Sequence, residues 1–163
     1  AADLKDRSID ILINNAGIFG PRNIGIDNMD YQAWTDVIGV NTLSPLRISS
    51  AFIKHVAQSE MKKIITISSI MGSISKNDSG GEYIYRSSKA AVNMVMRSFA
   101  HSIDAHEITV AMFHPGWVKT DMGGESASID VKTSVSGLRS SIAGLNVKDT
   151  GSFFNYDGEP LPW

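Results

Sequence analysis

The stretch that decides the fold is Ile9-Asp-Ile-Leu-Ile-Asn14, which is followed at once by Asn15-Ala16-Gly17. Its residues are almost continuously apolar and mostly β-branched, a composition typical of a strand that is covered on both faces. The small residues and the glycine that follow favour a turn. The stretch therefore predicts one buried strand of a parallel sheet, ending near residue 14.

Outward from this strand, the chain alternates strands and helices. Three more runs are predicted as strands, over residues 62–69, 108–113 and 152–155. Apolar residues at steps of three and four predict three helices, over residues 29–58, 83–105 and 131–145. The first helix is expected to bend near Asn41 and Pro45. This alternation is typical of an α/β fold with a parallel sheet, and nothing in the 163 residues divides it into more than a single domain.

Composition excludes several classes of partner. Fifteen Lys and Arg face 17 Asp and Glu, so the formal net charge of -2 gives no general attraction to nucleic acid or to an anionic membrane. No apolar run approaches the roughly 20 residues of a membrane helix. The chain has no Cys, and its four His residues show no spacing suited to metal binding. We therefore expect no nucleic-acid, membrane or metal site.

The beginning of the chain, Ala1-Ala2-Asp3, has neither an initiator Met nor a signal sequence. The apolar strand over residues 9–14 also needs a neighbour on each edge and cover on both faces. We therefore expect a fragment or a processed form of a longer protein, whose preceding half completes the sheet.

The segment Tyr85-Arg-Ser-Ser-Lys89 opens the second long helix and carries the clearest chemistry. Positions i and i+4 lie on one face of a helix, so Tyr85 and Lys89 share an environment. A tyrosine hydroxyl has an ordinary pKa near 10, and an adjacent positive charge lowers that pKa toward the range of a general acid or base. Taken alone, the pair is also compatible with chance.

Further polar groups fall at the ends of strands. Ser68 and Ser69 close the second strand, where one hydroxyl could hold a substrate carbonyl or could simply end the strand. Asn41 in the middle of a helix either caps it, bends it or binds a ligand. The turns Asn14-Asn15-Ala16-Gly17 and Pro115-Gly116-Trp117-Val118-Lys119-Thr120 could likewise approach a flat ligand or merely connect elements. All of these lie at the carboxyl ends of parallel strands or on the helices that follow, where one cleft would collect them.

The order Asn-Asn-Ala-Gly, helical Asn, strand-end Ser, Tyr-x-x-x-Lys and Pro-Gly resembles the short-chain dehydrogenase/reductase family over nearly the whole chain. Longer segments are similar to its C-factor branch, namely residues 69–74, 85–93 and 114–124 and the closing Phe-Phe-Asn-Tyr-Asp-Gly-Glu-Pro-Leu-Pro-Trp. The resemblance implies the C-terminal part of a doubly wound Rossmann fold, here a truncated domain over residues 1–163.

The same resemblance implies an NAD(P)-dependent oxidoreductase that moves a hydride between the nicotinamide and a carbonyl compound or secondary alcohol. Tyr85 would be the general acid or base, and Ser69, with Ser68 as the second choice, would polarise the substrate oxygen. Lys89 would lower the pKa of Tyr85 and hold the nicotinamide ribose, and Asn41 would hold a water in a proton relay. The implied cofactor contacts are Tyr85 and Lys89 together with Asn14, Ala16, Gly17, Pro115, Gly116, Val118 and Thr120.

The glycine-rich turn that the family uses for the pyrophosphate is expected in the preceding half, and Gly20, Gly25 and Gly39 do not replace it. The choice between NAD and NADP therefore cannot be read from these residues. We expect a cytoplasmic protein that forms a homo-oligomer through its two long helices. The alternatives are a non-catalytic signalling or interaction protein of the C-factor type and an inactive remnant of an enzyme.

Overall fold

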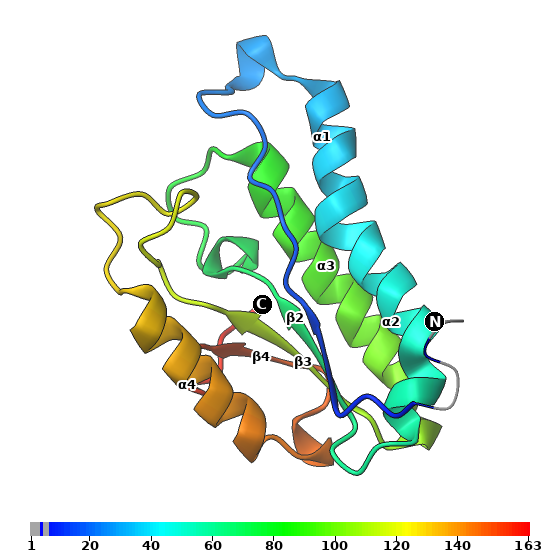
Figure 1. Cartoon of the computed structure of the whole chain (residues 1–163). Coiled ribbons are helices and arrows are strands. Elements are labelled where there is room, and N and C mark those ends of the chain that lie inside the picture. Colours follow the sequence, from blue (N-terminus) through cyan, green and yellow to red (C-terminus); the bar gives the residue numbers. More distant parts are fainter. Residues whose placement is uncertain (1–3, 5–6) are drawn as a thin grey trace.

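The predicted strands form one sheet. The computed structural model describes residue 4 and residues 7–163, and in it four parallel strands lie in the order β1-β2-β3-β4 (Figure 1). Their bounds are β1 Ile11–Asn14, β2 Lys63–Ile67, β3 Thr109–His114 and β4 Ser152–Asn155. Each lies within or overlaps the run of apolar residues that predicted it, so the parallel α/β fold is confirmed.

The two central strands are apolar because both of their faces are buried. Ile64 pairs with Val110 and Ile65 with Ala111, and all four side chains are fully buried. Ile64 and Val110 belong to the core on one face of the sheet, whereas Ile65 and Ala111 belong to the core on the other face. Successive strand residues point to opposite faces, so an unbroken apolar run needs both layers of helices.

The helices supply these layers (Figure 1). Two of them, α2 Ser44–Ala57 and α3 Tyr83–Ser102, cover one face, and α1 Tyr31–Ile38 packs against α3. The opposite face is covered by α4 Val131–Gly144, whose Ile142 packs in the second core. None of the helices in the described part of the chain is long and apolar enough to cross a bilayer.

The long helix predicted over residues 29–58 is interrupted at the predicted place. Between α1 and α2 lies a π-helical segment, Gly39–Leu43, in which the Ser44 backbone N–H donates to Gly39 O. A π segment inserts an extra residue into the helical turn and often marks a functional position. Asn41 lies in the middle of this segment.

Two features of these elements differ from the prediction. The helix α3 ends at Ser102 rather than at 105, because Ile103 leaves the helical conformation and a short 3-10 turn follows. The second difference is Lys63, which opens β2 yet is buried, with only 6% of its surface exposed. Its Nζ donates to Ile142 O at 2.7 Å and to Ala143 O at 3.0 Å, so a strand lysine caps the carboxyl end of α4.

Candidate active site

The first two turns of α3 present Tyr85 and Lys89 on one face, as their spacing predicts. Lys89 Nζ lies 5.7 Å from the centroid of the Tyr85 ring. Both residues are buried, with 7% of Tyr85 and 4% of Lys89 exposed. Lys89 Nζ also donates to Ile67 O at 3.0 Å, at the carboxyl end of β2. This bond ties the ammonium group to the end of the sheet where parallel α/β folds bind ligands.

Burial dominates the acid-base properties of the pair. It raises the pKa of Tyr85 above 10, and the Ser69 hydroxyl offsets part of this increase. Burial also lowers the pKa of Lys89 to about 8. The sequence predicted that the charge of Lys89 would lower the pKa of Tyr85, whereas this pKa is raised. The reason is that the loss of hydration on burial outweighs the interactions that stabilise the phenolate.

The two serines at the end of β2 have different roles. Ser69 caps the 3-10 turn Ile70–Gly72, accepting from the Met71 N–H at 3.1 Å, and its hydroxyl affects Tyr85. Ser68 instead donates to Lys89 O at 3.5 Å and fixes the strand to the backbone of α3. Ser69 is therefore the serine whose hydroxyl interacts with Tyr85, whereas the Ser68 hydroxyl contacts the α3 backbone.

Asn41 joins three elements through its side-chain amide, which is 1% exposed. Its Oδ1 accepts from the Ile18 N–H at 2.9 Å, and its Nδ2 donates to Ile18 O at 2.8 Å and to Ser88 Oγ at 2.9 Å. The amide thus pairs with the backbone that follows β1 and links it to α3. The side chain expected to hold a water is engaged in holding this loop.

The loop after β1 reaches the same cluster through Gly17. A Cβ added there would lie 3.4 Å from both Asn41 Oδ1 and Lys89 Nζ, so the glycine backbone faces the two groups directly. Ala16 is exposed beside it. The buried Nδ2 of Asn14 donates to Ser49 Oγ at 2.9 Å and to Thr66 Oγ1 at 3.2 Å inside the fold. Its Oδ1 is buried and accepts no hydrogen bond.

The loop after β3, which was predicted to contact the nicotinamide, is held mainly by contacts within itself and with α4. Pro115 O accepts from Ser134 Oγ at 2.6 Å, and Gly116 has a φ of 84° with no room for a Cβ beside Ile129. Thr120 Oγ1 accepts from the Gly123 N–H at 3.1 Å and donates to Val118 O at 3.3 Å, so its hydroxyl is used within the loop. These contacts fix the shape of the loop, and Met122 at its end provides the contact with Tyr85.

Two residues at the site, Phe19 and Arg22, were not among the candidates that the sequence supplied, and Met122 was considered only as part of an apolar wall beside the cleft. The Phe19 ring stacks on Tyr85 with centroids 4.5 Å apart and planes inclined by 22°. The Arg22 guanidinium lies 4.6 Å from the centroid of the Phe19 ring. Met122 Sδ is 4.0 Å from Tyr85 Oη. No motif marks these positions, because each contact depends on how the loops after β1 and β3 meet.

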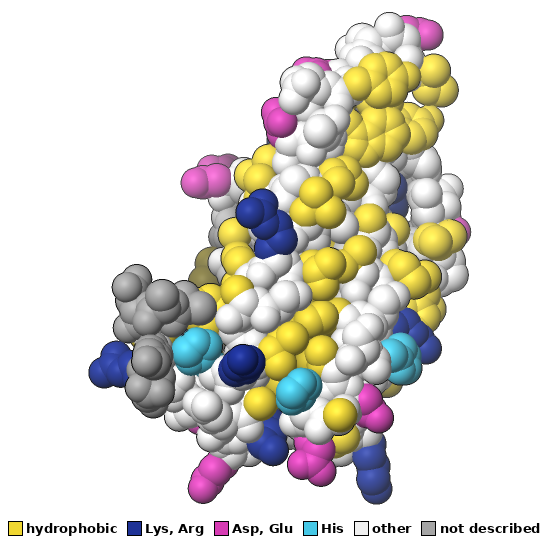
Figure 2. Space-filling model, turned by 90° about the vertical axis from the view of Figure 1, so that its right-hand side faces the viewer, with side chains coloured by type: hydrophobic (Ala, Val, Ile, Leu, Met, Phe, Trp, Pro, Cys, Tyr) yellow, Lys and Arg dark blue, Asp and Glu magenta, His cyan; other side chains and the backbone are white. Residues whose placement is uncertain are grey.

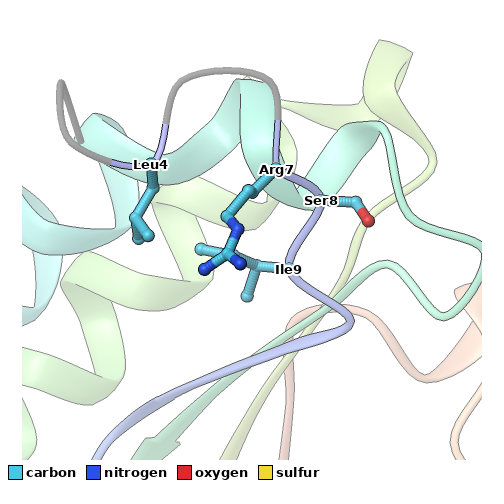
Figure 3. A pocket seen from close by; sticks show the side chains of 4 residues that line it. All are labelled: Leu4, Arg7, Ser8 and Ile9. Atoms are coloured by element: carbon cyan, nitrogen blue, oxygen red, sulfur yellow. The ribbon is translucent and has the colours of Figure 1, made fainter.

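Two open pockets formed by described residues lie away from this cluster. One, of about 420 Å³, is lined by Val135, Ser136, Arg139 and Ser140 on α4. Figure 3 shows the other, of about 470 Å³, which is lined by Leu4, Arg7, Ser8 and Ile9 near the start of the chain. Neither contains a candidate catalytic residue. Phe19 covers one face of the Tyr85 ring.

The parallel sheet with helices on both faces defines the class of fold, a Rossmann-type α/β fold shared with solved carbonyl reductases. A family model described as short chain dehydrogenase matches residues 2–129. The chain belongs to that family, which confirms the resemblance of its motifs.

Individual relatives agree with this assignment. The C-signal protein of Myxococcus xanthus is 39% identical over 155 residues, which cover 95% of this chain and 93% of that protein. Among solved structures, the carbonyl reductase Sniffer of D. melanogaster superposes with a TM-score of 0.92 at 39% identity, over 99% of this chain and 69% of that one. A carbonyl reductase from chicken fatty liver, solved with NADPH bound, superposes with a TM-score of 0.90 at 36% identity, over 99% of this chain and 69% of that one.

Proposed function

We propose that this chain catalyses hydride transfer between NAD(P) and a carbonyl compound or secondary alcohol, with Tyr85 as the proton donor or acceptor. The observation that carries the proposal is the convergence of Tyr85, Lys89, Ser69 and Asn41 with the Gly17 backbone in one buried cluster. Family membership and the similarity to solved carbonyl reductases support it.

The residues present suit a nicotinamide nucleotide. A lysine ammonium carries three N–H donors, and Ile67 O takes one of those of Lys89, so the group can also donate to ribose hydroxyls. The backbone of Gly17 approaches Lys89 and Asn41 as closely as a flat ligand needs. When bound, the nicotinamide would supply or accept the hydride. Asn14 would contribute through its backbone, since its amide is engaged inside the fold.

The proton chemistry follows from the position of Tyr85. A raised pKa keeps its phenol protonated at neutral pH, which suits donation to a carbonyl oxygen. Ser69 would donate a hydrogen bond to the same oxygen, and the charge of Lys89 would stabilise the phenolate left behind. Asn41 would act by holding the Ile18 backbone, and any relay water would bind outside its engaged amide hydrogens.

Titration of the 163-residue chain with NADH and NADPH, followed by nicotinamide fluorescence, tests the proposal. We expect binding that Lys89→Ala abolishes and that Lys54→Ala, an exposed lysine of α2, leaves unchanged. The affinity for the better cofactor should fall as the pH rises through about 8, because Lys89 then loses its charge. No binding up to millimolar cofactor would contradict a catalytic role for this chain.

A second candidate is an interaction or signalling role, which the 39% identity to a protein named C-signal favours. Figure 2 shows apolar side chains gathered on one face of the molecule. The exposed apolar residues of α1, the π segment, α2 and α3 include Tyr31, Leu43, Ile48 and Met94. We propose that this face pairs two copies of the chain, as predicted for the two long helices. Sedimentation of the wild type against Met94→Glu tests the pairing. The cytoplasmic location stays a prediction.

A further inference from the structure

Arg22 connects two loops that are 100 residues apart in the sequence. Its Nη2 donates to Met122 O at 2.7 Å, and its guanidinium stacks on the ring of Phe19. Phe19 in turn stacks on Tyr85, and the side chain of Met122 contacts the Tyr85 hydroxyl. The guanidinium is therefore in contact with both of the groups that cover the phenol.

This arrangement covers Tyr85 from two loops and leaves the covering elements themselves near the surface. Arg22 is exposed and Phe19 is half-buried, whereas Tyr85 is buried. Both loops lack helix or strand structure at these positions, so their contact with each other rests on few interactions. Such a cover can open without disturbing the sheet or the helices that hold Tyr85.

We propose that Arg22 is a positioning residue that clamps Phe19 and Met122 over Tyr85, and that release of this clamp admits the substrate carbonyl to the phenol. The substrate part of this statement rests on the proposed function, whereas the clamp itself does not. In the closed state the apolar ring and thioether exclude water from Tyr85, which agrees with the raised pKa of its hydroxyl. A substrate that displaces Phe19 meets a protonated phenol.

Nitration of tyrosine by tetranitromethane measures the clamp directly, because the reagent needs an accessible phenolate and no cofactor. The chain has no Cys to compete for the reagent. Tyr31, which is 72% exposed, serves as the internal reference. The rate at Tyr85 relative to Tyr31 is read from fragment ions of the peptide map at pH 8.

Removal of the clamp should raise this ratio by at least about tenfold in Arg22→Ala, because the variant loses one exposed cation–π contact and one hydrogen bond from a charged donor. Phe19→Ala should raise it at least as much, and Arg22→Lys should fall between Arg22→Ala and the wild type because it keeps the charge. The matched control is Arg97→Ala. Arg97 lies away from the site, and its guanidinium makes the same kind of contact, 5.0 Å from the centroid of the Trp163 ring. Circular dichroism checks that each variant is folded.

An unchanged ratio in Arg22→Ala would overturn the proposal, even if Phe19→Ala raises it, because Arg22 would then not hold the cover. An equal rise in Arg97→Ala would also overturn it, since the effect would be one of general loosening. The result does not depend on nicotinamide binding. A failed cofactor titration with an opened clamp would therefore refute the proposed reaction and leave the clamp standing.

Discussion

Replacement of Asn41 by Ala should destabilise the chain and release the loop after β1. The amide of Asn41 makes three hydrogen bonds, two to the backbone of Ile18 and one to Ser88, from a position that is 1% exposed. An alanine can replace none of them. The loop that carries Gly17 would lose its link to the π segment and to α3.

The size of the effect follows from the number of bonds. A hydrogen bond contributes about 1 kcal/mol net, and a buried group left without a partner costs about 1–3 kcal/mol. Ile18 is 40% exposed, so water can replace part of what its backbone loses. We therefore expect the free energy of unfolding to fall by about 2–4 kcal/mol, a large share of the roughly 5–15 kcal/mol of a typical domain.

Urea unfolding followed by circular dichroism measures this loss. The matched control is Thr42→Val, which removes a single buried hydrogen bond of 2.9 Å from Thr42 Oγ1 to Ser88 O in the same segment. It should cost about 1 kcal/mol. In nicotinamide titration, Asn41→Ala should also weaken binding more than Thr42→Val, because only the former frees Gly17.

A loss below about 1 kcal/mol for Asn41→Ala, or one no larger than that of Thr42→Val, would refute the reasoning. It would mean that the amide does not hold the loop in solution. Asn41 would then have to be explained by ligand or water binding alone.

Three further perturbations give distinct results. Gly72→Ala places a Cβ 2.7 Å from the backbone carbon of Lys89 and should cost about 1–3 kcal/mol in urea unfolding, whereas Gly144→Ala, with open space around it, should not destabilise. The pKa of His114 lies at about 4 because the group is buried, and the unfolded value is near 6.5, so stability should fall as the pH drops from 6.5 to 4. His114→Gln should remove about 2–3 kcal/mol of that loss, measured as the free energy of unfolding against pH. An unchanged pH dependence in the variant would show that other groups cause the loss. Lys63→Met should speed hydrogen exchange in the last turn of α4 by about tenfold, because the final carbonyls lose their donor; equal exchange would show that the cap is dispensable.

Local chemistry explains why the sequence predicted the order and the approximate bounds of the strands and helices. The buried run over residues 9–14 and the periodicity over residues 29–58 depend only on neighbours along the chain. The bend at Asn41 was also predictable, since an amide among apolar residues fits a regular helix poorly. The face shared by Tyr85 and Lys89 follows from the helical repeat alone.

The tertiary structure decided the contacts between loops and the effects of burial. No local pattern indicates that Asn14 turns into the core, that Lys63 caps a helix 79 residues away or that Arg22 reaches Met122. The direction of the Tyr85 pKa was equally beyond the sequence. Helical spacing places a lysine near the phenol, but the balance between its charge and lost hydration depends on Phe19 and Met122, which only the folded chain brings to that ring.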